Sequence, residues 1–264
     1  MTSAVRRALA WGVHFYTGLG CRAASIAVNI VKGTEASSGA GAFVWMIVAT
    51  LIDATDGTLA RAIHIKKVLP GFDGRRLDDL IDFLTYVALP LLLVWRAELL
   101  PAGTEAVLLL PLFAAAYGFC QVEAKTHDGY FLGFPSYWNI VAFYLYTLQP
   151  PGWLSVGMIA TLSVLTFVPL RYLYPTMKGR LNLWSNVLSA PWAGLIALSL
   201  WTLTSNEVVS RNAAFASLYF PLFYFGASWA TSVQYLLRAR GQQPDDAEGG
   251  MIATPLPPRE TTTP

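Results

Sequence analysis

Residues 53–61 read DATDGTLAR and residues 74–82 read GRRLDDLID. Asp53 and Asp56 are three positions apart, and Asp78 and Asp82 are four apart, so each pair lies on one face of its own helix. The helices that carry these pairs are otherwise strongly apolar. Carboxylates at membrane depth are costly unless they bind a counter-ion, a metal or a proton. The four aspartates therefore predict a functional site among membrane helices.

The composition is that of a membrane protein. Hydrophobic residues make up 55% of the 264-residue chain and charged residues 13%, about half the charged share of a soluble domain. A helix needs about 20 apolar residues to cross roughly 30 Å of hydrocarbon. Several segments approach that length, and they predict an all-α polytopic bundle of about eight transmembrane helices: 12–31, 40–61, 78–98, 103–121, 135–150, 152–173, 183–204 and 212–236.

The distribution of basic residues predicts the orientation in the membrane. Lys and Arg are concentrated on the side that holds the aspartate stretches, and the opposite side keeps Lys32, Arg96 and Arg211. By the positive-inside rule, the aspartates open to the cytoplasm. Arg6 and Arg7 precede the first apolar segment without an evident cleavage site, so we expect a first anchor and not a removed signal.

Charge and cysteine content limit the remaining possibilities. A net charge of +2 without a massed basic face argues against a nucleic-acid partner. Cys21 and Cys120 lie in separate apolar segments, which is typical of inert core thiols. The Pro- and Thr-rich end cannot bury enough apolar area to fold, so we expect a membrane domain over 1–240 and a disordered cytoplasmic tail over 241–264.

The four aspartates together form an oxygen-rich ligand set. Carboxylates from two neighbouring helices suit hard divalent cations such as Mg²⁺ or Mn²⁺. Four of them carry enough charge for two ions, and a two-ion site clamps and neutralises a phosphate or pyrophosphate. Asp79 lies off the shared face, and Asp73 precedes the helix, where we expect it to act as a cap.

Small residues follow the aspartates and leave room for a ligand. Gly57 and Ala60 reduce the bulk of one helix face, and Gly74 admits either a ligand or a closely packed helix. Arg61 lies one turn past Gly57 and can donate hydrogen bonds to phosphate oxygens. The alternative is structural: the carboxylates form ion pairs with neighbouring arginines at a wet helix end.

These residues resemble the signature of the CDP-alcohol phosphotransferase family, D-x-x-D-G-x-x-A-R, a spacer, and G-x-x-x-D-x-x-x-D. Every fixed position is met, by Asp53, Asp56, Gly57, Ala60, Arg61, Gly74, Asp78 and Asp82. The spacer, Ala62 to Asp73, holds 12 residues where most of the family has fewer. That longer spacer, together with VHFYT near residue 13 and FLGFPSYWN at 131–139, resembles the bacterial phosphatidylcholine synthase branch.

The resemblance implies an all-helical enzyme of the bacterial inner membrane, usually a homodimer. It implies transfer of the phosphatidyl group of CDP-diacylglycerol to choline with release of CMP, supported by Mn²⁺ or Mg²⁺. It further implies two metal ions held by Asp53, Asp56, Asp78 and Asp82, with Asp82 also the general base, and a CDP moiety bordered by Asp53, Gly57, Ala60, Arg61 and Gly74.

Choline offers no hydrogen-bond donor on its quaternary ammonium, so aromatic faces are the expected binding groups. Tyr86, Tyr137 and Trp138 fall on the side of the aspartates and are our candidates. Tyr and Trp belts occur at every membrane interface, which gives these residues an ordinary structural explanation. Tyr172, Tyr174 and Glu123 lie on the same side.

Other acceptors and another class of protein stay open from the residues alone. Serine, inositol or glycerol phosphate can replace choline, although a phosphorylated acceptor needs a basic pocket and the cytoplasmic loops offer few cations for one. A cation transporter also uses intramembrane carboxylates. A transporter would need polar residues that continue to the opposite leaflet, whereas here the charged cluster stops at one leaflet.

Overall fold

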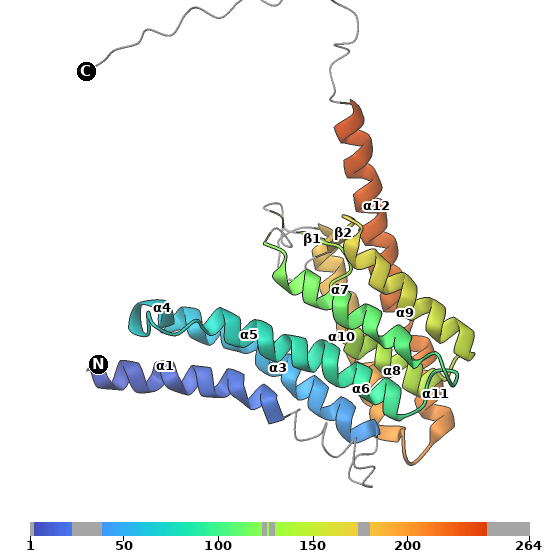
Figure 1. The fold of residues 1–264 in the computed structure, drawn as a ribbon, viewed down its shortest axis with the longest axis horizontal. Helices are drawn as coiled ribbons and strands as arrows, with labels where there is room; N and C mark the ends of the chain where they lie inside the picture. Colours follow the sequence, from blue (N-terminus) through green and yellow to red (C-terminus); the bar gives the residue numbers. More distant parts are fainter. Residues whose placement is uncertain (1–2, 23–38, 123–125, 127–129, 174–179, 242–264) are drawn as a thin grey trace, which may run out of the picture.

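The computed structural model describes residues 3–22, 39–122, 126, 130–173 and 180–241, and most of these residues are helical (Figure 1). Two helical stretches are long and apolar enough to cross a membrane, Gly41–Ala62 and Leu181–Thr202. The prediction of a mainly helical chain is confirmed, whereas the count of eight spans is not. Residues 23–31 of the first predicted segment, residues 242–264 of the predicted tail, Glu123 and Tyr174 lie outside the described residues.

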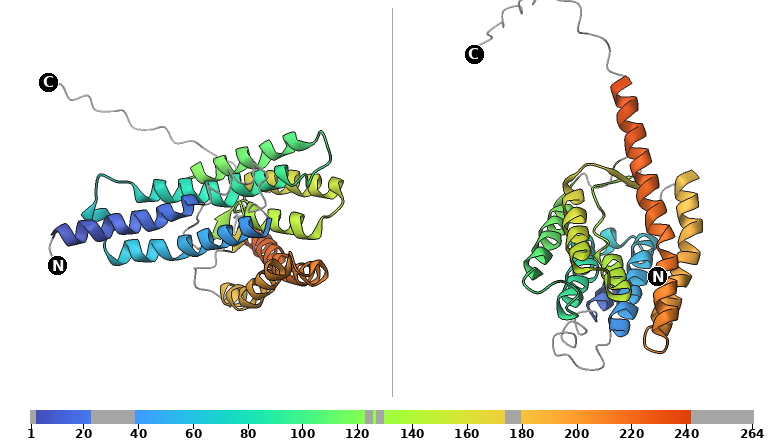
Figure 2. Two further views of the ribbon diagram at one scale, coloured as in Figure 1. Left: turned by 90° about the horizontal axis from the view of Figure 1, so that it is seen from below. Right: turned by 90° about the vertical axis from the view of Figure 1, so that its right-hand side faces the viewer.

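The N-terminal helices pack side by side around the aspartate stretches. Helix α1 (Ser3–Gly18), which ends in the short turn η1 (Leu19–Cys21), lies along α3 (Gly39–Ala62) and α5 (Gly74–Asp82) (Figure 2). This arrangement brings α1, far away in the sequence from both aspartate stretches, against each of them.

The link between α3 and α5 is short and contains the four-residue helix α4 (Ile65–Val68). His64 takes a left-handed backbone conformation, with φ of 54°, and this conformation separates α4 from α3. Asp73 then caps α5, since its Oδ1 accepts hydrogen bonds from the backbone N–H groups of Arg75 (3.1 Å) and Arg76 (3.2 Å). The predicted cap at Asp73 is confirmed.

Helix α5 continues without a break through the π-helical turn η3 (Phe83–Ala88) into α6 (Leu89–Arg96). Pro90 has no N–H to donate to the carbonyl of Tyr86, and its ring clashes there in a regular α-helix. The wider π turn directly precedes this proline and accommodates it. The predicted segment 78–98 therefore forms one helical rod together with α5.

The next helices are shorter than the predicted segments: η4 (Glu105–Leu108), α7 (Leu109–Cys120), α8 (Trp138–Leu148) and α9 (Gly152–Phe167). Helix α8 begins after Pro135 and after Ser136, whose φ of 56° is left-handed. Helix α9 ends before Pro169, because the chain is already extended at Val168. At 1.5 Å per residue, α8 covers roughly 16 Å, about half of the hydrocarbon thickness.

Two short strands amend the all-α prediction. Strand β1 (Tyr130–Leu132) pairs antiparallel with β2 (Arg171–Leu173), with Phe131 opposite Tyr172. Gly133 follows β1 with φ of 81°, and a Cβ at this position would collide with the carbonyl oxygen of Thr166. The glycine thus lets the two loops approach closely enough to pair.

The C-terminal helices are α10 (Arg180–Thr202), α11 (Glu207–Ser217) and α12 (Tyr219–Gly241). The predicted segment 212–236 is divided between α11 and α12, and Leu218 lies between them. Pro221 explains the division, since proline lacks a helical N–H and is tolerated in the first turn of a helix. The N–H of Leu218 instead closes α11 by bonding to the carbonyl of Phe215 (3.2 Å).

A buried apolar cluster joins α3 to the α5–α6 rod and to α8. It includes Phe43 of α3, Val87 of η3, Leu89 of α6 and Trp138 of α8. Phe43 meets Phe143 edge to face, with ring centroids 5.7 Å apart. Close packing of this kind holds membrane helices together, so the cluster fixes how α3 faces α5.

Candidate functional site

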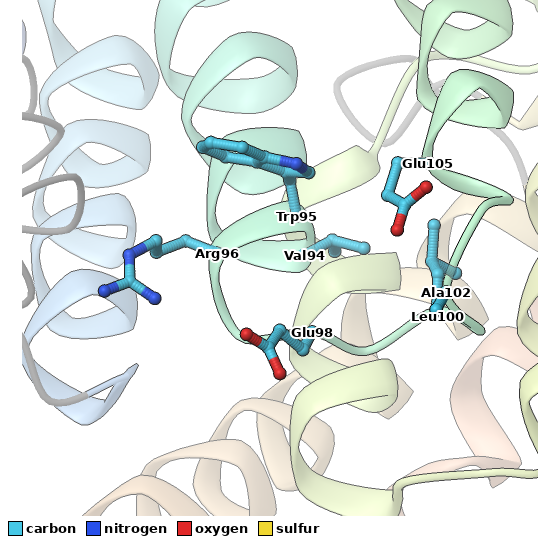
Figure 3. A pocket seen from close by; sticks show the side chains of 7 residues that line it. All are labelled: Val94, Trp95, Arg96, Glu98, Leu100, Ala102 and Glu105. Atoms are coloured by element: carbon cyan, nitrogen blue, oxygen red, sulfur yellow. The ribbon is translucent and has the colours of Figure 1, made fainter.

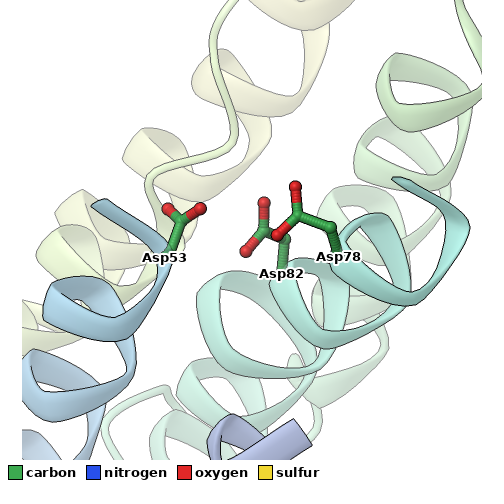
Figure 4. Close-up of side chains that lie close together, drawn as sticks. All are labelled: Asp53, Asp78 and Asp82. Carbon is green, nitrogen blue, oxygen red and sulfur yellow. The ribbon is translucent and has the colours of Figure 1, made fainter. Parts of the chain in front are cut away.

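Three carboxylates converge between α3 and α5. Asp53 of α3 faces Asp78 and Asp82 of α5, and one oxygen of each lies within 4.8 Å of the others (Figure 4). All three side chains are half-buried. The spacing of four residues places Asp78 and Asp82 on the same side of α5, as the sequence predicted.

Asp56 is not brought into this group. It is 5% exposed, and its Oδ2 accepts a hydrogen bond of 2.7 Å from the hydroxyl of Thr17 on α1. Three residues of helix turn a side chain by about 300°, so Asp56 lies about 60° around α3 from Asp53 and meets α1. A ligand role for Asp56 stays a prediction.

Tyr86 lies directly beside the three carboxylates. Its hydroxyl donates a hydrogen bond of 2.8 Å to Oδ2 of Asp53. Tyr86 follows Asp82 by four residues, so both side chains project from the same side of the rod. The sequence named Tyr86 for its aromatic face and missed this hydroxyl, although the spacing of four from Asp82 was a visible signal.

Arg61 covers Gly57 on the exposed part of α3. A Cβ added at Gly57 would lie 3.2 Å from Arg61 Nη1, and Nη2 of the same guanidinium donates to the Thr58 hydroxyl at 3.0 Å. Ala60 is half-buried on the same helix. The small residue at 57 therefore leaves room for the Arg61 side chain, which is exposed on α3.

Gly74 serves helix packing. A Cβ at Gly74 would lie 2.5 Å from Cε1 of His14, a contact that forces a shift. His14 is 8% exposed, and its ring centroid lies 4.4 Å from that of Phe72 and 5.9 Å from that of Trp11. The sequence left ligand approach and helix packing open at Gly74, and the contact with His14 favours packing.

The other two choline candidates lie in an aromatic cluster that involves α12. Trp138 is 1% exposed and meets Phe134 edge to face at 5.4 Å. Tyr137 faces Tyr224 of α12 at 6.3 Å. The three predicted aromatic residues are thus divided between two places, with Tyr86 beside Asp53.

A cavity of about 590 Å³ lies at the opposite end of the α5–α6 rod (Figure 3). Its lining comes from the end of α6 and the following loop up to η4: Val94, Trp95, Arg96, Glu98, Leu100, Ala102 and Glu105. Asp82 precedes Val94 by 12 residues, roughly 18 Å along the helix axis. This cavity is therefore separate from the carboxylates.

The three carboxylates fit a hard divalent cation. Oxygens bound to one Mg²⁺ at about 2.1 Å lie roughly 3 to 4 Å apart, so small side-chain rotations bring the three oxygens within reach of one ion. Carboxylate oxygens are also the ligands that Mg²⁺ and Mn²⁺ prefer. Asp53, Asp78 and Asp82 can therefore bind a divalent metal.

The described residues thus combine two helices long and apolar enough to cross a membrane with three carboxylates that can bind a divalent cation, the features of a helical membrane protein with a candidate metal site. No protein-family model matches the chain. The chain is 37% identical to the phosphatidylcholine synthase of Pseudomonas aeruginosa over 172 residues, which cover 65% of this chain and 71% of that protein. It is 38% identical to the phosphatidylcholine synthase of Bradyrhizobium diazoefficiens over 212 residues, 80% of this chain and 77% of that protein. The chain belongs to the phosphatidylcholine synthase family, which confirms the resemblance seen in the motif.

Proposed function

We propose that the protein transfers the phosphatidyl group of CDP-diacylglycerol to choline, forming phosphatidylcholine and CMP. The observation that carries this proposal is the convergence of Asp53, Asp78 and Asp82 from the two halves of the motif. Membership of the phosphatidylcholine synthase family supports choline as the acceptor.

The carboxylates are the metal-binding groups of this proposal. Asp53, Asp78 and Asp82, with Asp56 beside them, hold two divalent ions, Mn²⁺ or Mg²⁺. When bound, such ions neutralise the negative charge of the pyrophosphate. The two α3 carboxylates are each oriented by a hydroxyl from another helix, which supports their use as fixed ligands.

The CDP moiety lies along the exposed end of α3. Asp53, Gly57, Ala60 and Arg61 border it, and Gly74 borders it only through its backbone, because His14 fills the space beside its Cα. Arg61 is exposed and ends over Gly57, so its guanidinium can turn from Thr58 to donate two hydrogen bonds to phosphate oxygens.

Asp82 is the general base. The choline hydroxyl does not ionise unaided, so it loses its proton as its oxygen attacks the phosphatidyl phosphorus. The new oxygen–phosphorus bond forms, the bond from that phosphorus to the bridging oxygen breaks, and CMP leaves with that oxygen. The Asp82 carboxylate takes the hydroxyl proton. Asp82 lies one turn further along the helix than Asp78, on the same side.

Aromatic residues hold the quaternary ammonium of choline. Tyr86 is beside Asp53, where its ring can contact the acceptor, and Tyr137 and Trp138 are the further candidates. Cation–π contacts of this kind need a ring face and no hydrogen-bond acceptor.

The enzyme is a multi-pass protein of the bacterial inner membrane with about eight spans and its site facing the cytoplasm. Helices α3 and α10 are long and apolar enough to cross, and Arg61, Arg75 and Arg76 flank the carboxylates, as the positive-inside rule requires for a cytoplasmic face. We further propose a homodimer and a membrane domain over residues 1–240.

An acceptor assay tests the proposed function. Membranes that carry the protein receive CDP-diacylglycerol, Mn²⁺ and, in turn, labelled choline, serine, inositol and glycerol phosphate. We expect labelled phosphatidylcholine and CMP with choline, and no lipid product with the other three. A labelled product from one of those three and none from choline would overturn the choice of acceptor, and membranes carrying Asp78→Ala provide the inactive control.

A further inference from the structure

We propose that Thr17 of α1 is a positioning residue that fixes Asp56 for metal binding. This inference rests on the proposed function, in which Asp56 belongs to the metal-binding set. The Thr17 side chain is 6% exposed, and its hydroxyl donates to Asp56 Oδ2 at 2.7 Å between α1 and α3. Thr17 lies outside both aspartate stretches, and no spacing in the chain pairs it with Asp56.

The hydrogen bond is directed at the carboxylate. The Thr17 oxygen also lies 3.3 Å from the carbonyl of Val13, one turn earlier in α1. A hydroxyl has one proton, and the shorter contact to a charged acceptor is the stronger of the two. A buried carboxylate without a donor is costly, so the hydrogen bond from Thr17 holds Asp56 in one orientation.

Helix α1 is itself anchored on both sides of the site. His14, one turn before Thr17, packs its ring against Gly74 at the start of α5. The hydroxyl of Tyr16 lies 2.9 Å from that of Thr55 on α3. These contacts hold α1 against both aspartate stretches. The Thr17 hydroxyl therefore keeps its position relative to α3.

The consequence concerns the second oxygen of Asp56. Because Thr17 engages Oδ2, it determines the direction in which Oδ1 is presented. Hydrogen-bond partners that orient metal ligands typically change metal affinity or activity about 10- to 100-fold when they are removed. The same range is expected for loss of the Thr17 hydroxyl.

The test measures Mn²⁺ binding to the purified full-length protein without substrates, by electron paramagnetic resonance of the free ion. Thr17→Val keeps the shape of the side chain but removes the hydroxyl, and we expect affinity to fall about 10- to 100-fold. Thr17→Ser keeps the hydroxyl and should restore affinity. In the Asp56→Asn background, Thr17→Val should add nothing, because the two residues act as one unit.

Thr166 offers a matched control. It is 5% exposed, and its hydroxyl lies 3.3 Å from the carbonyl of Leu162 one turn earlier, as Thr17 does from Val13. Thr166→Val should leave Mn²⁺ affinity unchanged.

Wild-type Mn²⁺ affinity in Thr17→Val, or an equal loss in Thr166→Val, would overturn the proposal. If Thr17→Val does not fold, Thr17→Cys replaces it, because a thiol is a weaker hydrogen-bond donor than the hydroxyl of Thr17→Ser. Equal Mn²⁺ affinities of the Cys and Ser variants would then contradict the proposal. Failure of the wild type to use choline in the acceptor assay would refute the proposed acceptor alone, because the binding comparison needs no substrate.

Discussion

The N-terminal and C-terminal helices both bury hydroxyl groups at their interfaces, but these hydroxyls end on different partners. Around α3, Thr17 and Tyr86 donate to the carboxylates of Asp56 and Asp53. Among the later helices, Ser199 meets Ser210 at 3.1 Å, and the hydroxyl of Tyr144 meets that of Ser217 at 2.9 Å. The first pairs contain charge, and the second pairs are neutral.

This difference distinguishes the candidate functional site around α3 from the structural contacts between the later helices. One hydroxyl does not neutralise a carboxylate, so carboxylates such as those near α3 are stabilised further by a counter-ion, a metal or a proton. Neutral hydroxyl pairs satisfy each other and stabilise helix packing, typically by about 1 kcal/mol or less in membranes. We therefore expect substitutions near α3 to affect chemistry and those between α8, α10 and α11 to affect stability.

Removing a convergent carboxylate should have the largest effect. Asp78→Ala takes one of three ligands from the metal group, so activity should fall by several powers of ten while the protein stays folded. Phosphatidylcholine formation in membranes measures this loss, and excess EDTA should act on the wild type in the same way. Asp79→Ala, one residue further along α5 and off the ligand face, is the matched control. Wild-type turnover in Asp78→Ala would show that Asp78 of α5 is not a metal ligand.

The role of Asp82 can be separated from that of a ligand. Asp82→Asn keeps the shape and one oxygen but cannot accept a proton, and loss of a general base typically slows a reaction about 100- to 10,000-fold. We expect kcat to fall within that range and binding of CDP-diacylglycerol to stay close to that of the wild type. Wild-type kcat in Asp82→Asn would show that another group takes the choline proton.

Tyr86 gives a sharper test, because its ring and its hydroxyl have different proposed roles. Tyr86→Phe keeps the ring for choline but loses the donor to Asp53, so we expect activity and Mn²⁺ affinity to fall about 10- to 100-fold at an unchanged KM for choline. Tyr86→Leu removes the ring as well. Near-normal activity in Tyr86→Phe together with a raised choline KM in Tyr86→Leu would assign Tyr86 to choline alone.

The sequence predicted the parts of the site that depend on spacing within one helix. Asp78 and Asp82 share a face of α5 because they are four residues apart, and the cap at Asp73 follows from its place before a helix. Asp53 and Asp56 were expected on one face too, but a difference of about 60° is enough to direct them to different neighbours. Which neighbour each one meets depends on packing, so the pairing with Thr17 was not visible.

The fold shows the same division between local and tertiary information. Hydrophobic length found the helical segments, and Pro221 could have marked the break between α11 and α12. The pairing of β1 with β2 joins strands of three residues across about 40 positions, and such a pair has no strong local signal. The strand edge also contacts α12, because the Ser228 hydroxyl oxygen accepts a hydrogen bond of 3.1 Å from the backbone N–H of Leu173.

The smallest effect is expected from the neutral network of the C-terminal half. Tyr144→Phe removes the contact with Ser217 and the acceptor for Trp192 Nε1, which lies 3.0 Å from the Tyr144 hydroxyl. Loss of these bonds should lower the free energy of unfolding by about 1 kcal/mol, a fall in Tm of roughly 2 to 4 °C. Thermal unfolding of the purified protein measures this change, with Tyr146→Phe on the same helix as the control. Mn²⁺ affinity and kcat should not change, because no charge is altered; a loss of Mn²⁺ affinity in Tyr144→Phe would mean that the two halves are coupled and that neutral contacts also shape the site.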